Sequence, residues 1–244
     1  MQTRQSDAFE MMKKSLQFCV VATLIVGCSD DSKIEVGLTA YDERVIEYFS
    51  EVALGFEFGG ASEITRKWKD DMKIFVGGTK TAELMNELQS IVTEINGLAT
   101  DGFSISIVTD SIQMNFYIFL GPADEYGKKY PSEAGLAVDN WGLFSVYWDA
   151  SERIYKGNMY VDIDRANPAE EKHLLREELT QSLGLAKDSE RYDDSIFQKN
   201  WTTTNDYADI DRDLIRLLYH PQMQVGLNRS SAEQTLTQII LNEK

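Results

Sequence analysis

The sequence predicts an α+β fold, and three observations carry that prediction. The chain has 244 residues, of which 43% are hydrophobic and only 4 are Pro, so it can bury a core and is not a disordered chain. Its apolar residues recur at helical spacing in some segments and alternate at strand spacing in others. The expected order is strand, helix, four strands, helix, loop and helix, behind an N-terminal helix. We therefore expect one α+β domain.

Helices are expected where apolar residues follow the helical period between capping residues. These segments are 41–54, 81–95, 168–183, 209–219 and 231–240. The third has the clearest ends, because Asn167 is an N-cap, Pro168 takes the first helical position and Gly184 stops the helix. Gly97 is expected to end the second helix, and a capping box that starts at Ser231 is expected to begin the last.

Strands are expected where short apolar runs lie between turn residues. These segments are 72–76, 103–107, 115–120, 142–148 and 158–163. In the second, apolar residues alternate with serines, which indicates a half-buried strand. The third is continuously apolar, as expected when both faces of a strand are covered. The Gly-, Pro- and Lys-containing stretch between Leu120 and Gly142 is expected to be a loop.

Charge and composition exclude several classes of function. The formal net charge is −16, which repels phosphate backbones, so we expect no nucleic-acid partner. No apolar run reaches the roughly 18 residues that cross a bilayer. The only cysteines are Cys19 and Cys28, which excludes a disulfide framework and a Cys-rich metal site. The only histidines are His173 and His220, so this chain cannot supply three His ligands to one zinc ion.

The N-terminal segment 12–28 reads as a sorting signal. Lys13 and Lys14 form a basic start, and an apolar run over 18–26 is too short to span a membrane. The run ends in Ile-Val-Gly-Cys, with the cysteine at Cys28. This ending resembles the lipobox of bacterial lipoproteins, in which small residues precede a cysteine that is acylated and becomes the new N-terminus. The alternative is a buried core strand, which requires the basic start, the apolar length and the Gly-Cys ending to coincide by chance.

The lipobox resemblance implies a membrane-attached protein. Residues 1–27 would be the signal peptide, with translation starting at Met12, and 28–40 would be a lipidated tether. Acyl chains such as palmitate on Cys28 would anchor the chain to the membrane, since each buried methylene contributes about 0.8 kcal/mol. Ser29 follows the cysteine, which by resemblance to enterobacterial sorting favours the outer over the inner membrane. We therefore expect a lipid anchor in the bacterial cell envelope.

One stretch of the helix before Gly184 resembles the active-site helix of zincin metallopeptidases, and of metzincins in particular. In those enzymes H-E-x-x-H places two ligands on one helical face, and the residue after the first ligand is the general base. By that resemblance Glu177 stands at the first His and Glu178 at the base. Gln181 stands at the second His and Lys187 at the third ligand.

The resemblance continues beyond this helix. Segment 194–197 is similar to the turn where metzincins have Ser-Ile-Met, and 209–219 is similar to their closing helix. With its E-E-x-x-Q-x-L-G segment, the chain most closely resembles domain-of-unknown-function family 2927, proteobacterial proteins described as candidate lipoproteins. The resemblance implies a zincin (metzincin)-like mixed sheet with an active-site-type helix and a C-terminal helical subdomain. The metzincin-like domain would span 41–228, with an N-terminal helix, and a C-terminal helix would span 229–244.

The departures from the metzincin pattern concern the metal ligands. All three His ligands are replaced, and Phe197 stands where the Met is expected. A protonated ammonium cannot bind zinc, and a Gln carbonyl suits calcium or magnesium better. Asp188 could supply an oxygen, and His173 and Glu177, four residues apart on one helical face, could chelate a metal together. No cofactor is assigned with these ligands, and zinc or another divalent cation remains an alternative.

Two functions follow from this pattern. The favoured one is a lipid-anchored envelope protein whose degenerate metzincin-like domain binds an envelope protein, peptide or glycan without catalysis. The alternative is a metallopeptidase-like hydrolase with Glu178 as base and an atypical Glu/Gln/Asp metal site. We expect Glu177, Glu178 and Gln181 to line a cleft floored by the strands. We also expect Glu178 to accept hydrogen bonds from the turn at Ser195. If the glutamates instead lie on a solvated helix face, they would pair with neighbouring basic residues such as Arg176.

Overall fold

The computed structural model describes residues 37–58 and 60–244. The expected signal peptide (1–27) and Cys28 lie outside the described residues, as does most of the expected tether. The described residues belong to one compact unit. Within that unit, no helix is both long and apolar enough to cross a membrane.

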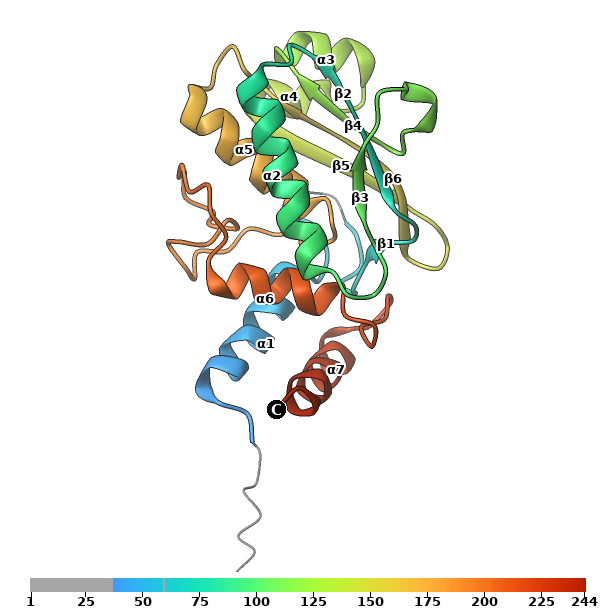
Figure 1. Ribbon diagram of the computed structural model, residues 1–244, viewed down its shortest axis with the longest axis vertical. Coiled ribbons are helices and arrows are strands. Elements are labelled where there is room, and N and C mark those ends of the chain that lie inside the picture. The colour runs from blue at the N-terminus through green and yellow to red at the C-terminus, as the bar shows by residue number, and fades with distance from the viewer. Residues whose placement is uncertain (1–36, 59) are drawn as a thin grey trace, which may run out of the picture. The chain divides into compact units, whose positions relative to one another are not determined.

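A mixed sheet of six strands forms the centre of this unit (Figure 1). Its strands are β1 (Lys67–Trp68), β2 (Met72–Gly78), β3 (Ile105–Ile107), β4 (Phe116–Leu120), β5 (Gly142–Trp148) and β6 (Arg153–Val161). The neighbours in the order β1-β6-β4-β2-β3 are all parallel. β5 runs antiparallel to β6 and, among the described strands, pairs with β6 alone, which makes it an edge strand.

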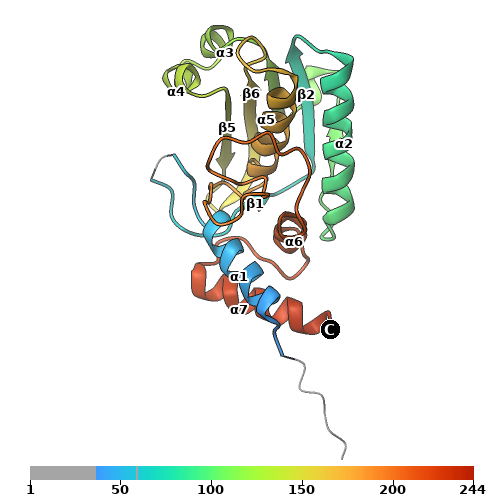
Figure 2. The same cartoon turned by 90° about the vertical axis from the view of Figure 1, so that its left-hand side faces the viewer.

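The helices lie in three groups around the sheet. They are α1 (Ala40–Val52), α2 (Ala82–Leu98), α3 (Ala123–Lys129), α4 (Ala134–Asp139), α5 (Pro168–Gln181), α6 (Asp209–Leu218) and α7 (Arg229–Asn242), with a short 3₁₀ turn at Ser111–Gln113. α2 and α5 cover one face of the sheet, and α3 and α4 lie on the other face (Figures 1 and 2). α1, α6 and α7 gather below one end of the sheet.

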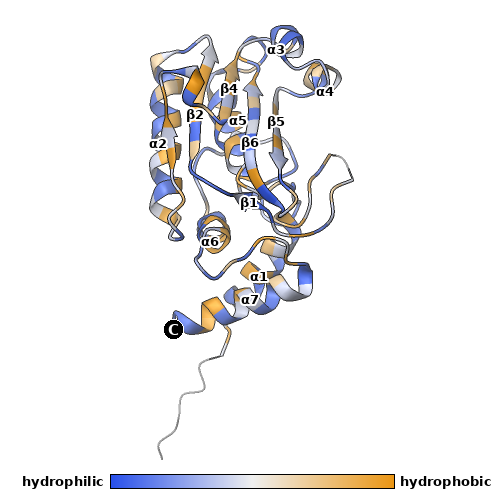
Figure 3. Cartoon of the chain, turned by 90° about the vertical axis from the view of Figure 1, so that its right-hand side faces the viewer, coloured by the Kyte–Doolittle hydropathy of each residue, from blue (hydrophilic) through white to orange (hydrophobic). Residues whose placement is uncertain are grey.

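The strand pleat divides the core between the two faces of the sheet. Along β4, Phe116 and Ile118 belong to the large core beneath α2 and α5. Tyr117 and Phe119 point the opposite way and pack in a second cluster with Tyr126 of α3. All five residues of β4 are buried, so the prediction of a strand covered on both faces is confirmed. Figure 3 shows the alternation of hydrophobic and hydrophilic residues along α2 that places its apolar stripe on this core.

The segment between β4 and β5 is not the loop that the sequence predicted, because it contains α3 and α4. The lysines that suggested a loop lie at the end of a helix, and a glycine lies where two helices pack together. Lys128 and Lys129 lie in the last turn of α3, where positive charge interacts favourably with the helix dipole. At Gly127 a Cβ atom would lie 2.9 Å from the Cβ of Ala134, so glycine lets the two helices approach closely.

Other boundaries differ from the prediction by a few residues. Gly97 lies inside the last turn of α2 rather than beyond it. β6 begins at Arg153, earlier than predicted, because its exposed polar half still pairs with β5. α7 is capped by Asn228, whose side chain accepts a hydrogen bond from the backbone N–H of Ser231, so the predicted capping box was wrong. The α+β class is confirmed.

Candidate functional site

Helix α5 is fixed at both ends by residues that the sequence identifies. The side chain of Asn167 accepts hydrogen bonds from the N–H groups of Ala169 and Glu170, and Pro168 takes the first helical position, as predicted. At the other end Gly184 has φ +114°, a conformation that favours glycine. A Cβ there would lie 2.1 Å from the backbone oxygen of Arg66. The chain therefore turns sharply after α5 against β1.

A cavity of about 650 Å³ lies between α5 and the edge strand β5. It is lined by residues of α5, by Gly142 to Val146 of β5, and by parts of the segments 56–58 and 198–201. We call this cavity the α5–β5 cleft. The structure brings the candidate site residues together around it: His173, Glu177, Glu178, Gln181 and Asp188. Lys187 is not among the lining residues, and its ammonium lies 3.1 Å from a carboxylate oxygen of Glu63.

Glu178 lies at the base of the cleft and is only 8% exposed. Its carboxylate has no hydrogen-bond partner among the described residues and rests against Gly142 at the start of β5, where a Cβ would lie 2.5 Å from Oε1. Burial, followed by the charges of Glu177 and Asp188, raises the pKa of Glu178 well above its ordinary value.

The predicted hydrogen bonds from the Ser195 turn to Glu178 were wrong. The Ser195 hydroxyl donates to Oδ1 of Asp211 at 2.6 Å, and the N–H of Ile196 donates to Oδ2 of Asp211 at 2.9 Å. Asp211 lies in the first turn of α6, so that helix rather than α5 holds the turn. Burial raises the pKa of Asp211 to about 6 despite these bonds.

The other acidic residues on α5 and after it are engaged locally. Nε2 of His173 lies 3.3 Å from Oε2 of Glu177, and Nδ1 lies 2.6 Å from the carbonyl oxygen of Thr204. Burial lowers the pKa of His173, but the bond to Glu177, the charges of Glu177 and Asp188 and the contact with the Thr204 carbonyl oxygen together outweigh it, so the net shift is upward. The Gln181 amide donates to Asp188 at 2.6 Å. Burial and nearby carboxylates raise the pKa of Asp188 to about 7.

The basic residues that could have neutralised the glutamate pair face α2 instead. Arg176 contacts the carboxylates of Glu87 and Glu94 at 3.0 and 3.1 Å. Lys172 contacts Glu83 at 2.5 Å. The opposite side of α5, with Glu177 and Glu178, faces the cleft rather than these basic residues.

These residues do not form a metal site of the zincin kind. Among the described residues, no group of three His, Cys, Asp or Glu side chains could hold one metal ion. The Gln181 amide group is committed to Asp188, and the imidazole of His173 is committed to Glu177 and to a carbonyl oxygen. The donor set therefore does not fit a tetrahedral zinc centre.

Aromatic side chains form the walls of the cleft, and the sequence analysis did not single them out. Phe56 stacks on Trp148 of β5 with ring centroids 5.2 Å apart. Trp141 and Trp201 meet edge to face, also at 5.2 Å. Trp201 is 59% exposed and Phe58 is 51% exposed, so both lie at the mouth. The run of aromatic residues in 141–148 was the signal that could have indicated a binding wall.

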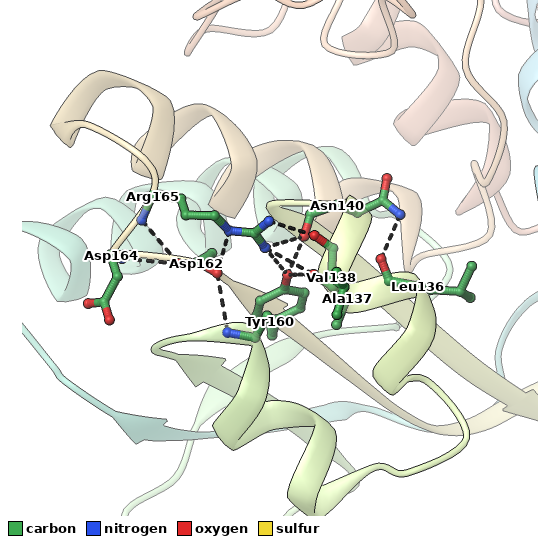
Figure 4. Close-up of polar contacts among 9 residues, drawn as sticks. Leu136, Ala137, Val138, Asn140, Tyr160, Asp162, Asp164 and Arg165 are labelled. Atoms are coloured by element: carbon green, nitrogen blue, oxygen red, sulfur yellow. Dashed lines mark hydrogen bonds and ion pairs between the residues drawn. The ribbon is translucent and has the colours of Figure 1, made fainter.

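The rim of the cleft on the α4 side is held by Arg165 (Figure 4). Its guanidinium donates to the carbonyl oxygens of Ala137, Val138 and Asn140 at 2.8–2.9 Å. It also contacts Asp162 at 2.7 Å. Because Leu136 and Asn140 at the end of α4 line the cleft, these bonds fix that part of its lining.

Comparison with known proteins places these residues within a family. The family described as "Protein of unknown function (DUF2927)" matches residues 42–238, which include every lining residue of the α5–β5 cleft. No curated protein matches the chain.

Proposed function

Because the chain belongs to DUF2927, a family whose description assigns no activity, we propose its function from the α5–β5 cleft. We propose that the protein is a lipid-anchored cell-envelope protein whose degenerate zincin-like domain binds an extended peptide segment of an envelope protein. The bound peptide is held and is not cleaved.

The observation that carries this proposal is the position of an edge strand along one wall of a cavity of about 650 Å³. The outer edge of β5 offers backbone N–H and C=O groups to which an extended peptide can add as a further strand. The aromatic walls offer apolar surface to its side chains, and the volume lies within the range typical of ligand cavities.

The arrangement around Glu178 supports binding without hydrolysis. A zincin glutamate takes a proton from a water molecule whose pKa a metal has lowered. The described residues lack a three-ligand group for that metal, and burial together with neighbouring carboxylates raises the pKa of Glu178 above its ordinary value. The observation that favours the hydrolase alternative is that Glu178 still lines the cleft at the position of the general base.

The lipid anchor is proposed from the sequence. The basic start at Lys13, the apolar run and the Gly-Cys ending at Cys28 support it. A net charge of −16 would keep the folded domain away from anionic headgroups, so attachment through the acyl chains alone is consistent with this composition.

A random peptide library incubated with the full chain tests binding and cleavage together. We expect a subset of peptides to be retained, with no new termini detected by mass spectrometry, with or without added zinc. Cleavage that is reproducible and is lost in Glu178→Gln would establish the hydrolase instead. Failure to retain any peptide would contradict the proposed binding function.

A further inference from the structure

We infer that the α5–β5 cleft selects a basic residue: the Glu178 carboxylate receives the guanidinium or ammonium group of an Arg or Lys side chain of the bound peptide. This inference rests on the proposed peptide-binding function and adds the chemical class of the ligand.

Glu178 lacks a hydrogen-bond partner among the described residues, whereas the other buried acidic residues have one. The other three buried acidic residues of the described chain are Glu133, Asp162 and Asp211, and each accepts hydrogen bonds from side chains or backbone. Glu178 is 8% exposed and accepts none from the described residues. Buried polar groups in folded proteins are nearly always paired, because an unpaired one loses its hydration without compensation. The open side of Glu178 faces the cleft, so its partner arrives from there.

The charges around the cleft also favour a cationic ligand. Glu57, Glu177 and Asp188 line it together with Glu178, and their mutual repulsion contributes to the raised pKa of Glu178. Two basic side chains also line the cleft. His173 is bonded to Glu177, and Lys199 lies 3.3 Å from Glu190. Lys199 lowers the pKa values of Glu57 and Asp188, but burial and like charges leave both pKa values raised. An incoming cation relieves the repulsion, whereas an anion increases it.

The lining of the cleft between its mouth and Glu178 suits the side chain of a basic residue. Glu178 lies at the base against Gly142, while the aromatic walls extend toward the mouth at Trp201. The charged group of a ligand must therefore move along apolar and aromatic surface before it reaches the carboxylate. Arg and Lys carry an aliphatic stem with a charge at its end, and their cations also interact favourably with aromatic faces. Against a carboxylate, the planar guanidinium of Arg adds a second hydrogen bond.

Titration calorimetry of the full chain with matched probes tests this inference. The probes are arginine amide, the peptide acetyl-Ala-Ala-Arg-Ala-Ala-amide, and the same peptide with citrulline, a neutral isostere of arginine. We expect the arginine peptide to bind at least tenfold more tightly than the citrulline peptide. In Glu178→Gln this preference is expected to disappear, whereas Glu171→Gln, on the same helix but outside the cleft, is expected to retain it.

A second variant tests the inference independently, in case Glu178→Gln does not fold. Gly142→Ala keeps every charge but places a Cβ 2.5 Å from the present position of Glu178 Oε1, so it displaces the carboxylate. We expect it to reduce the preference for arginine over citrulline as well. Circular dichroism of each variant verifies that the fold is retained.

The outcomes separate this inference from the proposed function. If the citrulline peptide binds as tightly as the arginine peptide, selection of a basic residue is overturned and peptide binding stands. If arginine amide binds in a manner that requires Glu178 while neither peptide binds, cation selection stands and peptide binding fails. If no probe binds, both are overturned.

Discussion

At the scale of single residues, the defining feature of the cleft is the carboxylate of Glu178, whose negative charge no neighbouring group of the described chain neutralises. Glu178 is buried, unpaired among the described residues and close to Glu177 and Asp188. This arrangement lowers the free energy of unfolding, because burial and like charges destabilise the charged form of Glu178. Proteins retain such costs at sites that serve a function, which is why this residue carries both the proposed function and the further inference.

Glu178→Gln is expected to increase the free energy of unfolding at pH 8 by about 1–3 kcal/mol, because it removes an uncompensated buried charge. The pKa values of Glu178 and Asp188 are raised in the folded state, that of Asp188 to about 7. The folded protein therefore holds more protons than the unfolded chain between the unfolded pKa near 4 and the folded pKa. The favourable contribution of these two carboxyl groups to the free energy of unfolding is complete below their unfolded pKa. It is lost as the pH rises through their folded pKa values.

Urea denaturation at pH 5 and pH 8 measures this effect. The stability of the wild type is expected to fall more between these pH values than that of Glu178→Gln. Glu125→Gln, at an exposed carboxyl outside the cleft, serves as the control. An equal fall for wild type and Glu178→Gln would show that folding does not raise the pKa of Glu178.

Trp201 supplies the second prediction at this scale. It is 59% exposed and meets Trp141 edge to face at the mouth of the cleft, so Trp201→Ala removes binding surface without opening the core. We expect about tenfold weaker affinity for the tightest peptide from the library, with stability unchanged. Tyr155→Ala, at a residue 48% exposed and outside the cleft, is the matched control. Similar affinities for the two variants would place the peptide elsewhere.

At the scale of elements, the position of α5 against β5 depends on how the chain leaves the helix. Gly184 combines a positive φ with a close approach to the backbone of Arg66. Trp68 reinforces this junction, because its indole N–H donates to the carbonyl oxygen of Ser182 at 3.0 Å. The end of α5 is thereby tied to β1, and the face with Glu178 is directed at β5.

Gly184→Ala is expected to destabilise the protein much more than Gly102→Ala, although both glycines have a positive φ, +114° and +95°. A Cβ at Gly184 would lie 2.1 Å from a backbone oxygen that cannot move aside, whereas a Cβ at Gly102 meets nothing within 4 Å. The conformational cost of about 1 kcal/mol is common to both substitutions. The difference in stability between the two variants therefore reports the steric clash at Gly184 alone. Thermal unfolding of the two variants measures it, and equal midpoints would contradict the tight junction.

At the scale of the whole molecule, the proposed attachment site at Cys28 lies outside the described residues. The family match covers residues 42–238 and does not include the lipobox-like segment. The described residues form one compact unit without a helix that could cross a membrane. The anchor is therefore tested by changing the N-terminal cysteines alone.

Cys28→Ser is expected to abolish acylation, so that the protein is recovered either uncleaved or in the soluble fraction. Cys19→Ser lies within the expected signal peptide and should leave acylation and mature size unchanged. Fractionation of cells combined with intact-mass measurement distinguishes the two. Recovery of Cys28→Ser in the membrane at the same mature mass as the wild type would refute the lipid anchor.

Local residue patterns determined much of the fold. The caps at Asn167 and Pro168 and the continuously apolar strand β4 appear as predicted. Helix α5 ends at Gln181, two residues before the predicted end, and Gly184 makes the turn that follows. The helices α3 and α4 were missed because Gly127 acts through its contact with Ala134 in the next helix rather than through its own helix propensity.

Tertiary structure alone decided the chemistry of the cleft. The sequence predicted which residues of α5 line the cleft. It could not show that Asp211 rather than Glu178 accepts the hydrogen bonds of the Ser195 turn. Nor could it show that Gly142 lies against Glu178, or that aromatic residues from distant segments form the walls. Burial, pairing and pKa depend on neighbours supplied by other elements, because electrostatic and packing energies follow distance in space and not separation along the chain.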